Sequence, residues 1–227
     1  MLVMKAWLET RWRLASIYGY SLIWLAFDYH NRHAPGADPG STLLVLWMIL
    51  TTFSMVLAGS GVRSQSPAGF PEGLTESTQF TIALPVSRMR LLLVRNAVGL
   101  LELLAVTVTV AGLTWSLIPS VRAFMTPADF ARLVLTTLLW LTGPYCAALF
   151  SVTFLAEPFS FMCAGWALLL LLWLLHHIAP AVDIIRAFGP ASPLITHRLP
   201  WPQLAACVTL ALLLFLAAAR VVQTREY

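Results

Sequence analysis

The chain alternates long apolar runs with short polar segments that are rich in proline and glycine. The apolar runs cover residues 14–27, 41–58, 88–118, 130–155, 159–175 and 203–219. A helix needs roughly 20 apolar residues to cross the hydrocarbon core, so the first run is short and the others come close to that length or exceed it. None has the alternating pattern, about ten residues long, of a transmembrane β-strand. The pattern predicts an all-α integral membrane protein with six transmembrane helices in a single domain, residues 1–227.

Composition agrees with a lipid environment. The 227 residues are 59% hydrophobic and 11% charged, with mean hydropathy +0.80, whereas soluble domains carry about 25% charged residues. The net charge is +4, and the basic residues lie between apolar runs, as signals of topology do. We therefore expect membrane lipid as a partner and no nucleic acid. Cys146, Cys163 and Cys207 fall inside apolar runs and are expected to be small buried hydrophobic residues.

Residues 2–14 form an amphipathic segment ahead of the first apolar run. Opposite charges four residues apart lie on a second face, away from the apolar one. The apolar face comprises Val3, Trp7, Thr10 and Leu14, and the charged face Lys5, Glu9 and Arg13. We expect an interfacial helix that lies on the membrane and is separate from the first span. The alternative is that these residues are the first turns of one tilted span. The segment has no signal-peptide pattern.

Local signals place several boundaries. Ser87 is an expected N-cap for a helix over residues 88–118, which would be about 46 Å long and so would project from the membrane by about two turns. Gly143-Pro144 predicts a kink in the fourth span. The polar loop 62–87 has room for a short helix over residues 74–84, ended by Pro85.

The distribution of Lys and Arg predicts the orientation. With six spans, nine basic residues share the side of the termini and five lie on the other side, or seven against five without Arg90 and Arg95. The excess places both termini and the loop 62–87 in the cytoplasm.

Candidate chemistry is sparse. The only lysine is Lys5, so the chain has no P-loop and is not expected to be an ATPase or to bind a cofactor itself. Glu102 is the one acidic residue deep in an apolar run, and it is interpreted as a substrate or proton contact or as a polar contact between helices. His176 and His177 follow the fifth span. A metal site with Asp183 and His197 is conceivable there, but an interfacial pair at a helix C-terminus is simpler.

The stretch from residue 57 to residue 102 resembles permease subunits of ABC-2 type transporters. It reads LAGSGVRSQ, then a polar loop, then FTIALPVSRMRLLLVRNAVGLLE. The most specific part is F-T-x-x-L-P-V-S-R at residues 80–88, followed by an apolar helix that carries Arg95. The layout of the whole chain is also similar to that family: an interfacial helix, six spans and a long outer loop over residues 176–202.

The resemblance implies a type V exporter-like permease fold in a bacterial inner (cytoplasmic) membrane. The chain would export a hydrophobic or amphipathic substrate together with a second permease copy or a related permease. A separate ABC ATP-binding subunit would bind ATP and Mg. A coupling helix near residues 74–84 would contact that subunit, and the outer loop would form short re-entrant helices. The implied ATPase-coupling residues are Leu74, Glu76, Phe80, Leu84, Pro85, Arg88, Arg90 and Glu157.

Two functions of other classes remain open from the sequence. One is an intramembrane enzyme that uses Glu102 with His176 or His197, although these residues are expected at different depths. The other is a structural or assembly subunit of a membrane complex, which would have no need of a coupling helix.

Overall fold

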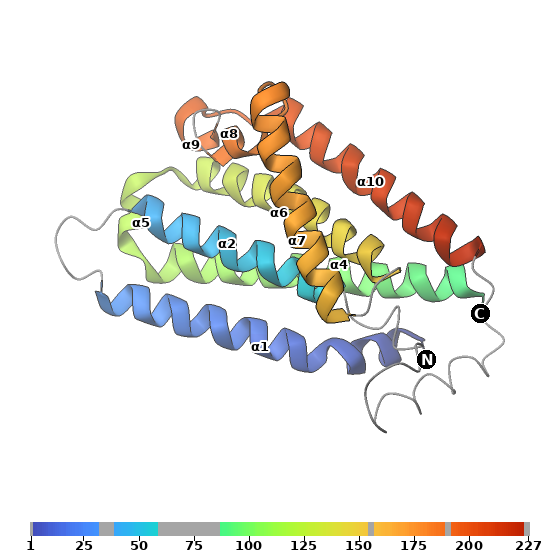
Figure 1. Cartoon of the computed structure of the whole chain (residues 1–227). Helices are drawn as coiled ribbons and strands as arrows, with labels where there is room; N and C mark the ends of the chain where they lie inside the picture. Colours follow the sequence, from blue (N-terminus) through green and yellow to red (C-terminus); the bar gives the residue numbers. More distant parts are fainter. Residues whose placement is uncertain (1, 32–38, 59–86, 154–156, 189–191, 225–227) are drawn as a thin grey trace.

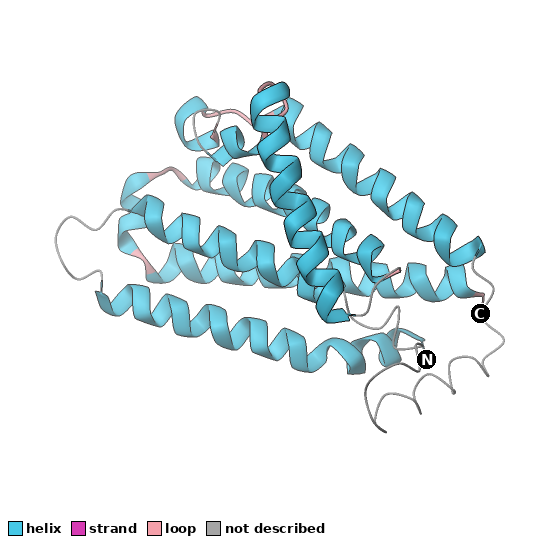
Figure 2. Cartoon of the chain, in the orientation of Figure 1, coloured by secondary structure: helices cyan, strands magenta, loops and turns pink. Residues whose placement is uncertain are grey.

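A computed structural model describes residues 2–31, 39–58, 87–153, 157–188 and 192–224, and every regular element in these ranges is a helix (Figure 2). The long helices are α1 (Leu2–Asn31), α2 (Pro39–Ala58), α4 (Arg88–Leu117), α6 (Pro127–Val152), α7 (Glu157–Ile178) and α10 (Trp201–Thr224). The short ones are α5 (Pro119–Phe124), α8 (Ile184–Phe188) and α9 (Pro193–Thr196). The predicted all-α class is confirmed.

Among the described residues, three helical segments are long and apolar enough to cross a membrane: Leu92–Leu117, Pro127–Val152 and Trp201–Thr224. Two shorter apolar helical stretches, Val45–Ala58 and Met162–Ile178, accompany them. Because such segments bury their backbone polar groups within themselves, they suit the hydrocarbon interior. The chain is thus a helical membrane protein, and the number of spans stays a prediction.

Helix α6 occupies the centre of the bundle, packing against α2, α4, α7 and α10, while α1 packs against α4 and α2. The long helices run back and forth, so that the first turn of α1 and the last turn of α10 lie on one side (Figure 1). Helices α5, α8 and α9 lie toward the other end (Figure 1). We call these the terminal end and the α8 end of the bundle.

The contact between α4 and α6 requires a glycine. Tyr145 of α6 is 2% exposed, and its ring lies over Gly99 of α4. A Cβ at position 99 would lie 3.1 Å from Cζ of Tyr145 and would collide with its hydroxyl oxygen. In the same helix, a Cβ at Gly112 would meet nothing within 4 Å. Gly99 therefore allows the close approach of the two helices.

The predicted boundary between an interfacial helix and the first span is wrong. Helix α1 continues through residue 14 and ends at Asn31, beyond the expected end at residue 27. One buried face runs along it at helical spacing: Thr10, Leu14, Ile17, Ser21 and Leu25. Since this face packs on α4, nothing favours a break in direction at residue 14. The structure matches the alternative, in which residues 2–14 are the first turns of one long helix.

Other boundaries agree with the sequence more closely. Ser87 caps α4 as predicted, because its Oγ accepts a hydrogen bond from the backbone N–H of Arg90 at 3.3 Å. Helix α6 begins at Pro127, three residues before the expected start, and passes through Gly143-Pro144 as one element. Residues 59–86, which contain the predicted coupling helix, lie outside the described residues.

Short helices α8 and α9 lie in the proline-rich segment 176–202, and the predicted outer side of this segment and its depth in a membrane stay predictions. The three cysteines are free. Cys146 and Cys207 are buried as expected, but Cys163 is exposed on α7. The burial predicted for Cys163 is wrong because its position faces outward, away from the contact between α7 and α6.

Candidate functional site

Glu102 lies inside the bundle, between α4 and α1. It is 5% exposed, and the hydroxyl of Thr10, itself 2% exposed, donates to its Oε1 atom. The second oxygen, Oε2, is buried and has no hydrogen-bond partner among the described residues. The geometry thus provides a polar contact between helices, one of the two interpretations of Glu102, and leaves one carboxyl oxygen unused.

Two further polar residues belong to the surroundings of Glu102. Arg95 lies two turns earlier on the same face of α4 and interacts electrostatically with Glu102. The hydroxyl of Tyr145 on α6 lies beside Gly99, between these two residues along α4. A polar group therefore forms where α1, α4 and α6 meet, at the point where Gly99 allows the helices to approach.

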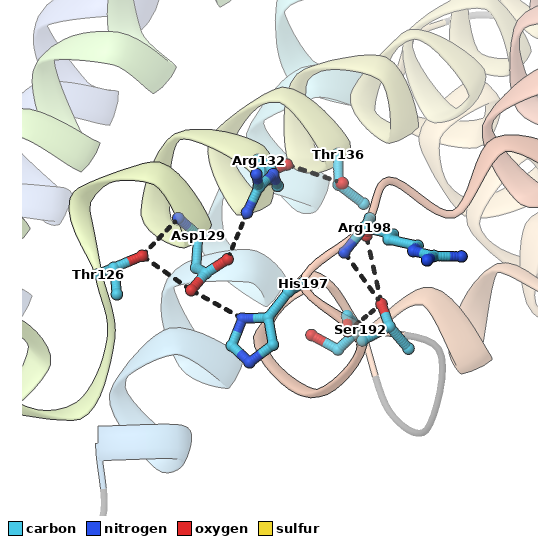
Figure 3. Close-up of polar contacts among 8 residues, drawn as sticks. Thr126, Asp129, Arg132, Thr136, Ser192, His197 and Arg198 are labelled. Atoms are coloured by element: carbon cyan, nitrogen blue, oxygen red, sulfur yellow. Dashed lines mark hydrogen bonds and ion pairs between the residues drawn. The ribbon is translucent and has the colours of Figure 1, made fainter.

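A second polar cluster lies at the α8 end, around Asp129 in the first turn of α6. Figure 3 shows its carboxyl group between the side chains of Thr126, Arg132 and His197. The Thr126 hydroxyl donates to Oδ2 at 2.8 Å, and Arg132 Nη1 donates to Oδ1 at 2.6 Å. His197 Nδ1 lies 2.9 Å from Oδ2. Asp129 thus joins the segment after α9 to the start of α6.

Asp183 forms a similar contact between α7 and α8. Its side chain is fully buried, and Oδ2 lies 2.7 Å from His176 Nδ1. Oδ1 accepts from the backbone N–H of Ile185 at 2.9 Å. The sequence grouped His176, Asp183 and His197 as a conceivable metal site, whereas the structure pairs His197 with Asp129. Within the described ranges, no three His, Cys, Asp or Glu side chains gather at metal-binding distance.

A cavity of about 130 Å³ lies between α2, α4, α6 and α8. Most of its wall is apolar or aromatic. Its lining residues are Leu43, Leu46, Trp47, Leu50, Thr107, Ala111, Phe130, Leu133, Val134, Thr137, Phe188 and Ser192. The hydroxyls of Thr107 and Thr137 donate to carbonyls of their own helices, at 2.8 and 2.9 Å. The cavity therefore offers a small, mainly apolar space at the α8 end of the bundle.

The structure describes only three of the eight residues that were predicted to couple the chain to an ATPase. Arg88 is the first residue of α4, Arg90 is exposed in its first turn, and Glu157 is the first residue of α7. The terminal end of the bundle holds both helix starts (Figure 1). The others lie outside the described residues: Leu74, Glu76, Phe80, Leu84 and Pro85.

Sequence reasoning missed Asp129 and the cavity. The pattern Thr126-Pro127-Ala128-Asp129 has the spacing of a helix N-terminus with an acidic residue in its first turn. It could have placed Asp129 at the start of α6. Its pairing with His197 depends on tertiary packing and has no local signal. No protein-family model, curated protein or solved structure matches the chain.

Proposed function

We propose that the chain is the membrane-spanning permease subunit of an ATP-binding cassette transporter of the ABC-2 type. It exports a hydrophobic or amphipathic substrate and is driven by a separate ATP-binding subunit, which binds ATP and Mg. The resemblance over residues 80–88 supports the proposal. It also supports a second permease copy or a related permease as partner, in a bacterial inner membrane with both termini cytoplasmic.

The observation that carries the proposal is the course of α4. Its 30 residues, about 45 Å long, begin at the last residue of the family-like motif, at a capped first turn with Arg90 exposed. Further along, Glu102 contacts α1, and Thr107 and Ala111 form part of the cavity wall. One helix thus connects the terminal end with the cavity toward the α8 end.

Such a helix can transmit movement. No proline interrupts α4, so its hydrogen-bond ladder is not broken in the way that kinks helices. A displacement of its first turn by a partner subunit would shift the cavity wall and the contact with α1 together. Arg90 can pair with carboxylates of an ATPase or with acidic lipid headgroups.

The test is co-purification of the tagged chain, followed by an ATPase assay. The wild type is compared with a variant in which residues 74–84 are replaced by a Gly/Ser segment of equal length, which keeps the chain connected. We expect a P-loop subunit to accompany the wild type and to be lost from the variant. A chain that purifies alone, or a partner retained by the variant, would contradict the proposal. Leu135→Ala, at an exposed position of α6, is the control.

The intramembrane enzyme is less well supported by the geometry. Glu102 contacts Thr10, whereas His176 and His197 contact Asp183 and Asp129. These separate contacts do not form one acid–base pair. If the chain purifies without a P-loop subunit, the alternative function, a subunit for the assembly of a membrane complex, is favoured.

A further inference from the structure

The cavity between α2, α4, α6 and α8 has the properties of a ligand site. We propose that it binds a single aromatic ring, either a small aromatic molecule or the aromatic end of a larger one. This inference goes beyond the proposed transport function, because it concerns binding to the chain alone and needs no ATPase.

Size limits the ligand. The volume is about 130 Å³, close to the engineered apolar cavity of about 150 Å³ that binds benzene. Sites for drug-sized ligands are larger, roughly 300–1,000 Å³. A single ring therefore fills the inner part of the site, and a larger ligand would extend through its open side.

The lining favours an aromatic ring. Trp47, Phe130 and Phe188 contribute rings from three different helices. The rings of Trp47 and Phe188 already contact each other, with centroids 4.8 Å apart and planes inclined by 45°. Aromatic rings gain from offset and edge-to-face contacts in addition to burial. A bound ring would extend this group, so we expect it to be preferred to an aliphatic group of equal size.

The wall contains polar groups of two kinds: threonine hydroxyls that bond within their own helices, and the Trp47 Nε1–H, which has no hydrogen-bond partner among the described residues. Thr107 and Thr137 use their hydroxyl protons within their own helices, and Ala111 presents only a methyl group. Because the site is partly open and its lining is mainly apolar, it has few groups that could hold a water molecule firmly. An apolar ring would therefore enter without displacing well-bound water, which is the favourable case for apolar binding.

The wall that α8 provides is held in place by Asp183. This residue binds the first turn of α8 through the Ile185 N–H and lies 2.7 Å from His176 of α7. Phe188 is the last residue of the same short helix. Asp183 and His176 are thus positioning residues for Phe188, which limits the size of the cavity.

Fluorine NMR can measure binding to the full chain in detergent, with fluorobenzene and fluorocyclohexane as probes. Wild type is expected to broaden the fluorobenzene signal saturably, with an affinity about two- to ten-fold higher than for fluorocyclohexane. Ala111→Leu fills the cavity and should abolish saturable binding. Retained binding in this variant, or none in the wild type, overturns the site. Equal affinity for both probes overturns the aromatic assignment.

A second variant tests for a gain of binding, which a loss of folding in the variant could not produce. Phe188→Ala enlarges the site and should bind 1-fluoronaphthalene more tightly than the wild type does. Ile185→Ala, at an exposed position of the same helix that does not line the cavity, is the matched control and should bind this probe no more tightly than the wild type. Failure of Phe188→Ala to bind the larger probe more tightly, with fluorobenzene binding intact, contradicts the position of the site.

Discussion

Asp129 and His197 are 68 positions apart, yet Oδ2 of the first lies 2.9 Å from Nδ1 of the second. The contact fixes a residue with an unusual backbone, because His197 has φ 52°. It follows α9 directly, and its N–H donates to the carbonyl of Pro193 at 3.0 Å, in the left-handed position that glycine usually occupies after a helix. The side-chain contact therefore offsets a backbone conformation that is costly for histidine.

Asp129→Asn should loosen the segment after α9. The amide keeps the size of the side chain but removes the negative charge that Arg132 and His197 contact, and charged hydrogen bonds are stronger than neutral ones. We expect faster hydrogen exchange in α9 and at His197, together with a lower melting temperature. Arg198→Gln, at an exposed neighbouring position, should leave both unchanged. Equal exchange in the wild type and Asp129→Asn would show that the contact does not hold the segment.

Gly99→Ala should destabilise the bundle by about 1–3 kcal/mol, the usual cost of overpacking a core. The new methyl group collides with the Tyr145 hydroxyl, and the stiff, buried ring cannot move away easily. Gly112→Ala, in the same helix, should be neutral or stabilising, since it gains helix propensity without a clash. Denaturant titration in detergent measures both. Equal stability of the two variants would mean that α4 and α6 are not as close as described.

Thr10→Val should weaken the contact between α1 and α4, because it keeps the shape of threonine but removes the hydroxyl that binds Glu102. Combined with Glu102→Met, which removes the acceptor, in a double-mutant cycle, it should reveal a coupling energy of about 1 kcal/mol, the size found between polar residues of membrane helices. Thr10→Ser retains the hydroxyl and should keep most of that energy. A coupling energy near zero would show that Thr10 does not bind Glu102.

Trp140→Phe and Trp47→Phe remove the same ring atoms but should differ in their coupling to Thr51. The Trp140 Nε1–H donates to Thr51 Oγ1 at 3.1 Å, whereas Trp47 Nε1 has no hydrogen-bond partner within the described part of the chain. In a Thr51→Val background, the cost of Trp140→Phe should fall by about 1 kcal/mol. The cost of Trp47→Phe should not change. Unfolding measurements on the four combinations test the difference.

The sequence predicted those parts of the fold that depend on local signals. The Ser87 cap and the extent of α4 follow from residues that neighbour one another, and both are confirmed. The continuity of α1 could not be predicted from its own amphipathic pattern. The charged face of residues 2–14 suggested an interface with lipid headgroups, but the decisive factor is one buried face that packs on α4 over the length of the helix.

The candidate sites depended still more on tertiary structure. The position of Glu102 in an apolar run predicted a buried polar contact, but its partner Thr10 lies 92 positions away. Likewise, the Thr126–Asp129 spacing marks the start of a helix without indicating His197. The cavity has no sequence signal, because its walls come from several helices whose apolar residues look like any other core positions.

The exposure of Cys163 has a practical consequence for experiments on this chain. Cys146 and Cys207 are 6% and 7% exposed, whereas Cys163 faces outward from α7. A membrane-permeant maleimide should therefore modify the native sequence at one position, without prior mutagenesis. A fluorophore or spin label attached there would report distances to a second copy of the chain, or the shielding of α7 when another subunit covers it.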